Sequence, residues 1–488
     1  MLLLAYDVGT SLIKATLINK EAEVISSSSI GYETLNRAPL YAEQNPKTWW
    51  ECICKVTAKL KALKPNEMSK VLAIGVSGHM LGCLALNCEG EPLYPALIHS
   101  DLRAKPQMER IKQEIGEAHL YSLTGGVLSP GTTLCKLLWL YENEPAVYKK
   151  TARFLQAKDY IVYRLTGNMD STDYSDASHG QLINIHTGDL LHDELKCLNL
   201  NSAKLPCINK STDLAGSLSA KAAAELGLCE GIPVVAGGGD GACANVGAGI
   251  TGEGDIYCSL GTTAWIAYNS ALPVIDEKRR IFNITALNGE HAGVFGTMQS
   301  AGKAVDWAKS LFSLESAAKL DEVASLAPPG CEGLVFLPYL EGERSPIFNE
   351  NAAGVFFGIT SRHTKAHFAR AVLEGVAFAL RSILDVYREQ RQFDYMKLIG
   401  GGAKSAFWLQ LIADICGIEL RTLKGGAAIT SLGAAFAAGV AVGVYKNFDE
   451  TAALIKTDKV ISNDPEAGIY EQMYNKYISL YPSIKHLF

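Results

Sequence analysis

The sequence predicts an α/β protein made of two domains with similar organisation. In its first half, short apolar runs typical of strands alternate with amphipathic helical stretches, which favours an α/β domain with a mixed sheet. Near residue 250 several glycines loosen the chain, and a similar order of elements follows. A chain of 488 residues is long enough for two hydrophobic cores. We therefore expect one domain over residues 1–249 and a second over residues 250–488, related by an old duplication.

In the first half, residues 2–6 predict a strand that leads through a tight turn into a second strand. Residues 71–76 predict a buried strand, and residues 82–87 predict its hairpin partner. Apolar periodicity predicts three further elements: helices over residues 47–63 and 130–144, and a strand over residues 232–236.

The second half opens with a strand over residues 256–258 and another tight turn. The further elements expected there are helices over residues 301–311, 367–387 and 431–442, and a strand over residues 396–399. Residues 241–249 and 433–441 consist almost entirely of small residues. Helices with small faces can cross closely, as two hinged domains require, although close packing inside one domain is the alternative.

Two short segments with a Gly-Thr turn form the main motif. Asp7-Val8-Gly9-Thr10-Ser11 follows the first strand, and Ser259-Leu260-Gly261-Thr262-Thr263 partly repeats it in the second half. Such a turn points backbone N–H groups and a hydroxyl into one space, which suits phosphate oxygens. Two such turns facing each other would clamp the phosphates of a nucleotide. Only the first segment has a carboxylate, so we expect a metal ion beside Asp7.

Two glycine clusters support a nucleotide site, because glycines after strands let a ligand approach the backbone closely. Gly237-Gly238-Gly239-Asp240 follows one predicted strand, and Gly400-Gly401-Gly402-Ala403 follows another. Residues 239–244 also fit the GxGxxA pattern of a dinucleotide-binding oxidoreductase, but Asp240 inside that loop would repel a pyrophosphate. Asp240 also has a structural alternative, since Asp is a favoured N-cap residue of helices.

Composition excludes several function classes. The net charge of −6 and pI near 6.0 give no reason to expect a nucleic-acid partner. The apolar opening stops at Asp7, too early for a signal peptide or membrane span. Twelve cysteines without a CxxC pair are typical of a reducing compartment, so we expect a cytoplasmic protein without a membrane partner.

Long segments carry a resemblance to a known family. They are GTTLCKLLWLYEN at residues 131–143, GVFFGI at 354–359 and HFARAVLE at 367–374. With them the chain resembles the FGGY carbohydrate kinases, of the superfamily of sugar kinases, heat-shock chaperones and actin. The xylulokinase-like pentulose kinases are most similar, through EQNP at 43–46, KDY at 158–160, DYSDAS at 173–178, FLPY at 336–339 and GERSP at 342–346.

The resemblance implies two ribonuclease-H-like domains, of the actin and hexokinase type, that flank a deep cleft. ATP, Mg²⁺ and a small sugar would bind between them, and a homodimer is an assembly to test. Asp240 matches the catalytic base, which accepts the proton of a sugar hydroxyl as that oxygen attacks the γ-phosphate.

Further roles are implied position by position. Asp7 and Asp240 match the residues at the metal. The residues implied to bind ATP are Asp7, Gly9, Thr10, Ser11, Gly261, Thr262, Thr263, Gly400, Gly401, Gly402, Ala403 and Gln410. The residues implied to face the sugar are Ser77, Gly78, His79, Met80, Asp101, Arg103 and Asp240.

The sugar-facing loops depart from the xylulokinase pattern. Gly-Gln-Met-His is replaced by Gly78-His79-Met80-Leu81, Trp-Asn-Asp by His99-Ser100-Asp101, and the usual Asn after the catalytic Asp by Gly241. A pocket with different hydrogen-bonding groups selects its sugar differently. The first expectation is a ketopentose such as xylulose. Kinases of ribulose, glycerol or gluconate type, and a non-catalytic sugar sensor on the same fold, stay open.

Overall fold

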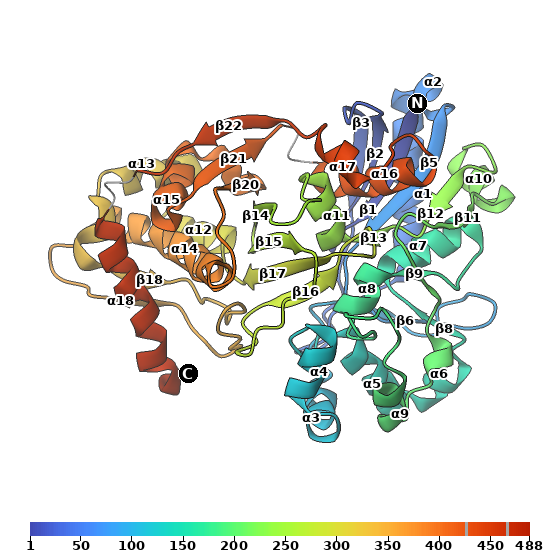
Figure 1. Cartoon of the computed structure of the whole chain (residues 1–488), viewed down its shortest axis with the longest axis horizontal. Coiled ribbons are helices and arrows are strands. Elements are labelled where there is room, and N and C mark those ends of the chain that lie inside the picture. The colour runs from blue at the N-terminus through green and yellow to red at the C-terminus, as the bar shows by residue number, and fades with distance from the viewer. Residues whose placement is uncertain (425–427, 465–467) are drawn as a thin grey trace.

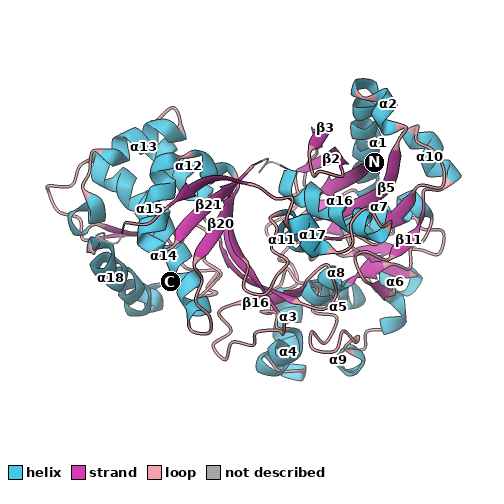
Figure 2. Ribbon diagram, turned by 45° about the horizontal axis from the view of Figure 1, so that its top comes forward, coloured by secondary structure: helices cyan, strands magenta, loops and turns pink. Residues whose placement is uncertain are grey.

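The structure is a computed structural model that describes residues 1–424, 428–464 and 468–488. Two lobes each contain a seven-stranded mixed sheet flanked by helices (Figures 1 and 2). In the described ranges, no helix combines the length and apolar character needed to span a membrane.

The first sheet has the strand order β11-β12-β5-β1-β2-β3, and β13 also pairs with β5. Its strands are β1 (Leu2–Val8), β2 (Leu12–Asn19), β3 (Val24–Gly31), β5 (Val71–Gly78), β11 (Leu214–Ser217), β12 (Pro233–Val235) and β13 (Gly238–Gly239). Central strand β1 is antiparallel to β2 and parallel to β5.

The second sheet has the order β16-β17-β15-β14-β20-β21-β22. Its strands are β14 (Ile256–Leu260), β15 (Ala264–Ser270), β16 (Phe282–Thr285), β17 (Ala292–Met298), β20 (Tyr395–Ile399), β21 (Glu419–Leu423) and β22 (Thr457–Ile461). Here β14 is antiparallel to β15 and parallel to β20, as β1 is to β2 and β5. The two halves therefore share their central pairing, as a duplicated organisation requires.

Helices cover both sheets. Those before residue 250 are α1 (Pro46–Leu63), α2 (Pro65–Met68), α3 (Lys105–Glu114), α4 (Glu117–Thr124), α5 (Thr133–Asn143), α6 (Pro145–Lys150), α7 (Ala157–Thr166), α8 (Tyr174–His179), α9 (His192–Cys197), α10 (Ala220–Leu226) and α11 (Asp240–Gly247). Those after it are α12 (Gly302–Leu311), α13 (Ala317–Ser325), α14 (Lys365–Arg388), α15 (Ala406–Cys416), α16 (Ile429–Ala441), α17 (Phe448–Ala452) and α18 (Ile469–Ile484).

The predicted helices and strands exist, with ends that differ by no more than three residues, but one predicted pairing is wrong. Residues 82–87 contain β6 (Leu84–Leu86), which pairs with β8 (Arg153–Leu155) in a separate small sheet and not with β5. The reason is that both edges of β5 are already taken, by β1 on one side and by β12 and β13 on the other. The remaining short pairs are β4 (Glu43–Gln44) with β7 (Ala96–Leu97), β9 (Thr172–Asp173) with β10 (Ile208–Asn209), and β18 (Val335–Leu337) with β19 (Val355–Phe357).

The two small-residue helices cross between the sheets, which confirms the close crossing expected from their composition. A Cβ on Gly433 of α16 would lie 1.9 Å from the Cys243 carbonyl oxygen of α11. A Cβ on Gly247 of α11 would lie 1.9 Å from the Ile429 carbonyl oxygen. The helices thus touch backbone to backbone, at a distance that no other residue allows.

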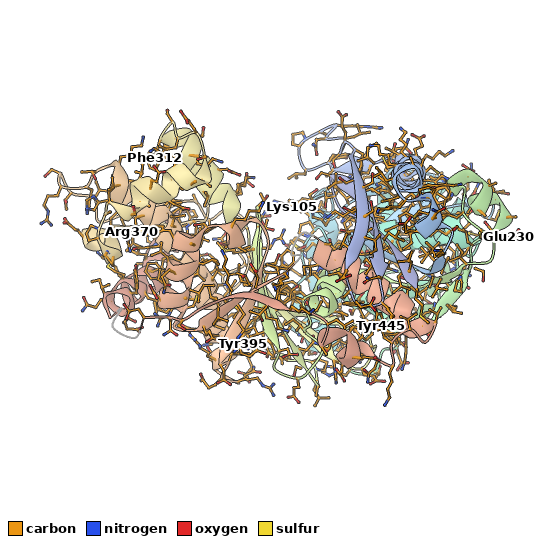
Figure 3. The ribbon with its side chains drawn as sticks, turned by 90° about the horizontal axis from the view of Figure 1, so that it is seen from above. Lys105, Glu230, Phe312, Arg370, Tyr395 and Tyr445 are labelled. Carbon is orange, nitrogen blue, oxygen red and sulfur yellow. The ribbon has the colours of Figure 1, made fainter. Side chains whose placement is uncertain are left out.

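Each crossing helix packs against a sheet. Helix α16, late in the chain, lies on β1 and β5 of the first sheet (Figure 1). Tyr445, which follows α16, lies in the lobe of the first sheet (Figure 3). Helix α11 contacts the second sheet, where the Asn245 amide donates to Asn269 of β15 at 3.4 Å. A division at residue 250 therefore separates the sheets, whereas α16 returns to the first lobe.

The lobes also meet through ion pairs of exposed side chains, which are Lys105–Glu350, Lys210–Glu290 and Glu117–Arg279. Lys105 at the start of α3 lies between the lobes (Figure 3), and its ammonium group is 2.7 Å from Glu350 of the second lobe. Exposed pairs of this kind contribute about 0–1 kcal/mol each, so they add little to the stability of the contact between the lobes.

Candidate active site

Asp7 lies at the carboxyl edge of the first sheet, where three parallel strands end side by side. It is the penultimate residue of β1, and Ser77 is opposite it on β5. Gly239 of β13 is opposite Gly78 of β5, so Asp240 follows at the same edge. Ligands of α/β sheets bind at this edge. The fold thus brings Asp7, the start of the sugar-facing loop and Asp240 together.

The Gly-Thr turn after β1 has its carbonyl groups occupied and its middle amides free. Tyr32 donates to the carbonyl oxygens of Gly9 and Ser11. The Gln44 side chain donates to the carbonyl of Thr10 at 2.8 Å. The N–H groups of Thr10 and Ser11 donate to no acceptor among the described residues. Free N–H groups in a turn are what a phosphate group binds, so the geometry supports the predicted phosphate site.

The second Gly-Thr turn, between β14 and β15, shares this property. Its Gly261 and Thr262 carbonyls accept hydrogen bonds from the start of α12, where Gly302 N–H donates at 2.9 Å and Lys303 N–H at 3.0 Å. The N–H groups of Thr262 and Thr263 find no acceptor in the described part of the chain. This turn is one residue shorter than the first, so the two resemble each other in chemistry more than in shape.

The second glycine cluster lies directly against this turn. Gly400 has φ +98°, and a Cβ there would lie 2.5 Å from the Leu260 carbonyl oxygen. Gly401 begins a 3₁₀ helix with Gly402 and Ala403, η3 (Gly401–Lys404), and no atom of the described residues lies within 4 Å of a Cβ built on it. A flat ligand can approach such exposed backbone. Gln410 lies further along α15, where its amide already donates to the Ser462 carbonyl at 3.0 Å.

Asp240 begins helix α11. Gly239 holds the N-cap position, so the N-cap alternative for Asp240 is wrong by one residue. Burial, and then the negative charge of Asp7, raise the pKa of Asp240 to about 7. Burial raises the pKa of Asp7 to about 6, although Lys14 and Ser77 lower it. A carboxylate that titrates near neutral pH is well suited to accept a hydroxyl proton.

The two carboxylates fit a magnesium ion that is also held by phosphates. The described residues contain no cluster of three or more His, Cys, Asp or Glu side chains arranged as metal ligands. Mg²⁺ does not need one, because it binds through one or two carboxylates, waters and substrate phosphate oxygens. Asp7 raises the pKa of Asp240, which is the signature of two adjacent negative charges without a cation. The oxygen-only donor set therefore fits the ion.

These shifts predict how stability depends on pH in the protein without nucleotide or metal. An aspartate in an unfolded chain has a pKa of about 3.9. Because the pKa of Asp240 is raised to about 7 in the folded state, Asp240 stays protonated to a higher pH there than in the unfolded chain. The folded state therefore loses stability as pH rises between these two pKa values. We expect Asp240→Asn to unfold at a higher temperature than the unmodified protein at pH 8 and with a smaller difference at pH 4.5. Calorimetry at both pH values measures this, and an equal difference at both would contradict it.

The sugar-facing loop after β5 carries a buried imidazole without partners. His79 is 1% exposed, its ring lies 5.5 Å from Trp49 and 6.2 Å from His99, and neither ring nitrogen has a hydrogen-bond partner among the described residues. Burial lowers the pKa of His79 to about 3 and that of His99 to about 4, so both rings are neutral. Lys136 fixes the loop by donating to the Leu81 carbonyl at 2.7 Å. Neutral imidazoles are suited to bind uncharged hydroxyls.

Asp101 and Arg103 satisfy each other behind that loop. The Arg103 guanidinium donates to Asp101 at 2.7 Å and to Glu43 at 2.8 Å, and Arg103 is 6% exposed. Asp101 also accepts the Ala42 N–H at 2.7 Å. Met80 packs on the backbone before Asp240, where a Cβ on Gly239 would lie 2.4 Å from its Cε atom. Asp101, Arg103 and Met80, which are predicted to face the sugar, are thus placed to support the loop after β5.

Sequence reasoning gave no role to several residues that the fold brings here. Arg344 follows β18 in the second lobe, is exposed, and its side chain makes no ion pair among the described residues. Its charge lowers the pKa of His99 and His179, after the larger effect of burial. Lys14 is opposite Asp7 in the β1–β2 pair. The GERSP segment contains Arg344, but nothing in the sequence shows which lobe it faces.

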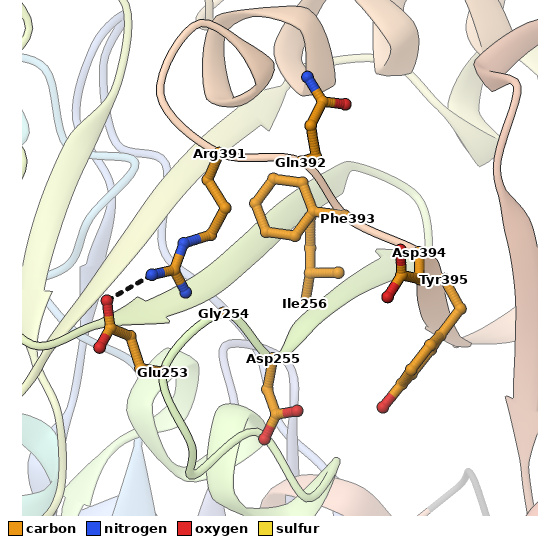
Figure 4. A pocket seen from close by; sticks show the side chains of 9 residues that line it. All are labelled: Glu253, Gly254, Asp255, Ile256, Arg391, Gln392, Phe393, Asp394 and Tyr395. Atoms are coloured by element: carbon orange, nitrogen blue, oxygen red, sulfur yellow. Dashed lines mark hydrogen bonds and ion pairs between the residues drawn. The ribbon is translucent and has the colours of Figure 1, made fainter.

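Two hollows lie away from these residues. One of about 290 Å³ lies at the start of β14 and β20, opposite the end that carries Gly261 and Gly400 (Figure 4). There Arg391 points to Glu253 and pairs with it (Figure 4). The other, of about 130 Å³, lies beside Tyr174 and His291. Neither contains a predicted site residue.

Two mixed sheets with equivalent pairing, each with a Gly-Thr turn between its central antiparallel strands, define an α/β protein of the two-domain, actin-like class. Residues 2–247 match the N-terminal domain of the FGGY family of carbohydrate kinases, and residues 256–442 match its C-terminal domain. The chain therefore belongs to the FGGY family, and it is a sugar kinase. The oxidoreductase alternative is wrong.

Relatives and solved structures agree with this family. The chain is 34% identical to a xylulose kinase from Staphylococcus epidermidis, over 99% of this chain and 97% of the relative. A ligand-bound xylulose kinase from Lactobacillus acidophilus superposes with a TM-score of 0.94 at 28% identity, covering 99% of this chain and 98% of the other. A gluconate kinase from the same organism gives the same TM-score at 27% identity and the same coverage.

Proposed function

We propose that this protein transfers the γ-phosphate of ATP, bound with Mg²⁺, to a hydroxyl of a ketopentose such as xylulose. The observation that carries the mechanism is Asp240, a carboxyl group with a pKa raised to about 7 at the edge shared with Asp7 and the sugar-facing loop. Identity to a xylulose kinase over almost the full length supports the ketopentose.

The chain's own residues divide the work. Asp240 accepts the hydroxyl proton while the sugar oxygen bonds to the γ-phosphorus and ADP leaves. Free N–H groups of Thr10, Ser11, Thr262 and Thr263 bind phosphate oxygens, and Gly400 to Ala403 face the adenosine. Asp7 and Asp240 would hold Mg²⁺, which would supply positive charge to neutralise the phosphates. His79 and His99 bind sugar hydroxyls, with Asp101 and Arg103 behind them.

Arg344 favours a second candidate substrate, an aldonate such as gluconate. Its charge acts on His99 and His179, and it forms no ion pair among the described residues, so it can pair with the acid group of a substrate. The gluconate kinase neighbour supports this alternative.

Two experiments distinguish these substrates. In a coupled assay of ADP release, we expect D-xylulose to give a higher kcat/KM than D-ribulose, glycerol or D-gluconate. Stimulation by none of them would favour the sensor.

For Arg344→Gln we expect kcat/KM with D-xylulose to fall by less than about tenfold, the cost of one hydrogen bond to an uncharged sugar. Arg344→Lys, which keeps the charge, is the control. If D-gluconate is the preferred substrate and Arg344→Gln lowers its kcat/KM by about 100-fold or more, the substrate is an aldonate instead. A loss of that size is expected when a desolvated ion pair is broken.

A further inference from the structure

A buried polar cluster behind the glycine loop has no part in the mechanism above. Lys158 at the start of α7 is fully buried, with its ammonium nitrogen 2.6 Å from Asp159, 3.2 Å from Asp173 and 3.5 Å from Asp176. One cation with three carboxylates is a costly arrangement to bury. Such a cluster needs a reason beyond stability, and its contacts point to the loop that carries Asp240.

The cluster contacts this loop at both ends. At one end, Lys158 donates to the Ala236 carbonyl at 3.2 Å, immediately before the glycines. At the other, the Gly239 N–H donates to the Ser175 hydroxyl oxygen at 2.9 Å. Ser175 in turn donates to Asp173 at 2.6 Å, and Asp173 faces Lys158. A chain of bonds therefore runs from the lysine to the residue that precedes Asp240.

The glycines give this loop no side chains of their own, so its position depends on its pairing with β5 and on contacts such as these. Gly237 has φ +71°, and a Cβ on it would lie 2.1 Å from the Val76 carbonyl oxygen. Glycines fit this space but leave the backbone more freedom than other residues would. Asp240 begins its helix directly after Gly239, so the direction of the Gly239 N–H sets where the carboxylate points.

We infer that Ser175 is a positioning residue for phosphoryl transfer, which holds the Asp240 carboxylate in place by accepting the Gly239 N–H. This inference rests on the proposed role of Asp240. Ser175 is fully buried, and its hydroxyl contacts the loop that carries Asp240 by accepting the Gly239 N–H. Misplacement of a reacting group by about 1 Å can cost roughly 10²-fold in rate.

The chain offers a matched control. Ser211 is also buried and donates its hydroxyl to the same Asp173 oxygen at 3.0 Å, but its hydroxyl makes no bond to Gly239. Both Ser175→Ala and Ser211→Ala therefore disturb the cluster, and only Ser175→Ala removes the bond to the catalytic loop. We expect Ser175→Ala to lower kcat by about 10–100-fold with KM for ATP and sugar within about threefold, and Ser211→Ala to keep kcat within about threefold.

A double-mutant cycle shows whether Ser175 acts through Asp240. In an Asp240→Asn background, Ser175→Ala should lower the residual kcat by less than about twofold, because the carboxylate that it positions is gone. An equal loss in both backgrounds, or an equal loss from Ser175→Ala and Ser211→Ala, would overturn the inference and indicate a purely structural role. If Asp240→Asn alone keeps near-normal kcat, the proposed mechanism fails instead, so the two failures are distinguishable.

Discussion

Replacing Asp240 with asparagine is expected to lower kcat for sugar phosphorylation by about 10²–10⁴-fold, the usual contribution of a general base. Asparagine keeps the shape of the side chain at the start of α11 but cannot take the hydroxyl proton. Because the proposed ATP site uses the backbone of both Gly-Thr turns and not the Asp240 side chain for affinity, we expect the Kd of ATP to change by less than about threefold. Steady-state kinetics with the preferred sugar, together with calorimetric titration of ATP, measure the two effects.

Asp255 provides the control for this experiment. It lies in the hollow of Figure 4, before β14, and accepts the Gly252 N–H at 3.0 Å. The five residues of β14 separate it from the second Gly-Thr turn. Asp255→Asn should therefore keep kcat within about threefold, since it removes a charge far from the phosphates. Near-normal turnover of Asp240→Asn would contradict the assigned base.

Much of the candidate site could be proposed from the sequence because its parts are local. Gly9-Thr10 and Gly261-Thr262 each follow a strand, and tight turns with free N–H groups can be recognised from a few residues. Asp240 stood out in the same way, as a carboxylate after a glycine cluster. These features depend on neighbours in sequence, so one chain is sufficient to find them.

The residues that were missed are near the site through tertiary structure. Arg344 comes from a loop of the second lobe, and the start of α12 reaches the second Gly-Thr turn through hydrogen bonds to its carbonyls. Ser175 lies in a segment that the family resemblance includes, but its bond to Gly239 spans 64 positions. Hydrophobic periodicity carries no information about such contacts.

The wrong pairing of residues 82–87 has a similar cause. The sequence after β5 has a turn and an apolar stretch, which is the usual signal of a hairpin. Nothing local shows that β12 and β13, more than 150 residues later, occupy the other edge of β5. The same limit applies to α16, whose small residues predicted a close crossing but not its return to the first sheet.

That crossing gives the largest expected effect on stability. A Cβ on Gly433 would lie 1.9 Å from the backbone oxygen of Cys243, and a backbone atom cannot rotate away as a flexible side chain can. We expect Gly433→Ala to lower the free energy of unfolding by about 3 kcal/mol, at the upper end for overpacking, although alanine favours helices by about 1 kcal/mol. Denaturant titration measures the change.

The effect should extend to catalysis, because α11 begins with Asp240 and crosses α16 at the site of the clash. Forcing the helices apart moves α11, so we expect kcat of the folded variant to fall as well. Gly468→Ala is the matched control, since no atom in the described part of the chain lies within 4 Å of a Cβ at Gly468 and its φ is −58°. If Gly433→Ala is as stable and as active as Gly468→Ala, the helices tolerate separation and the crossing does not hold Asp240 in place.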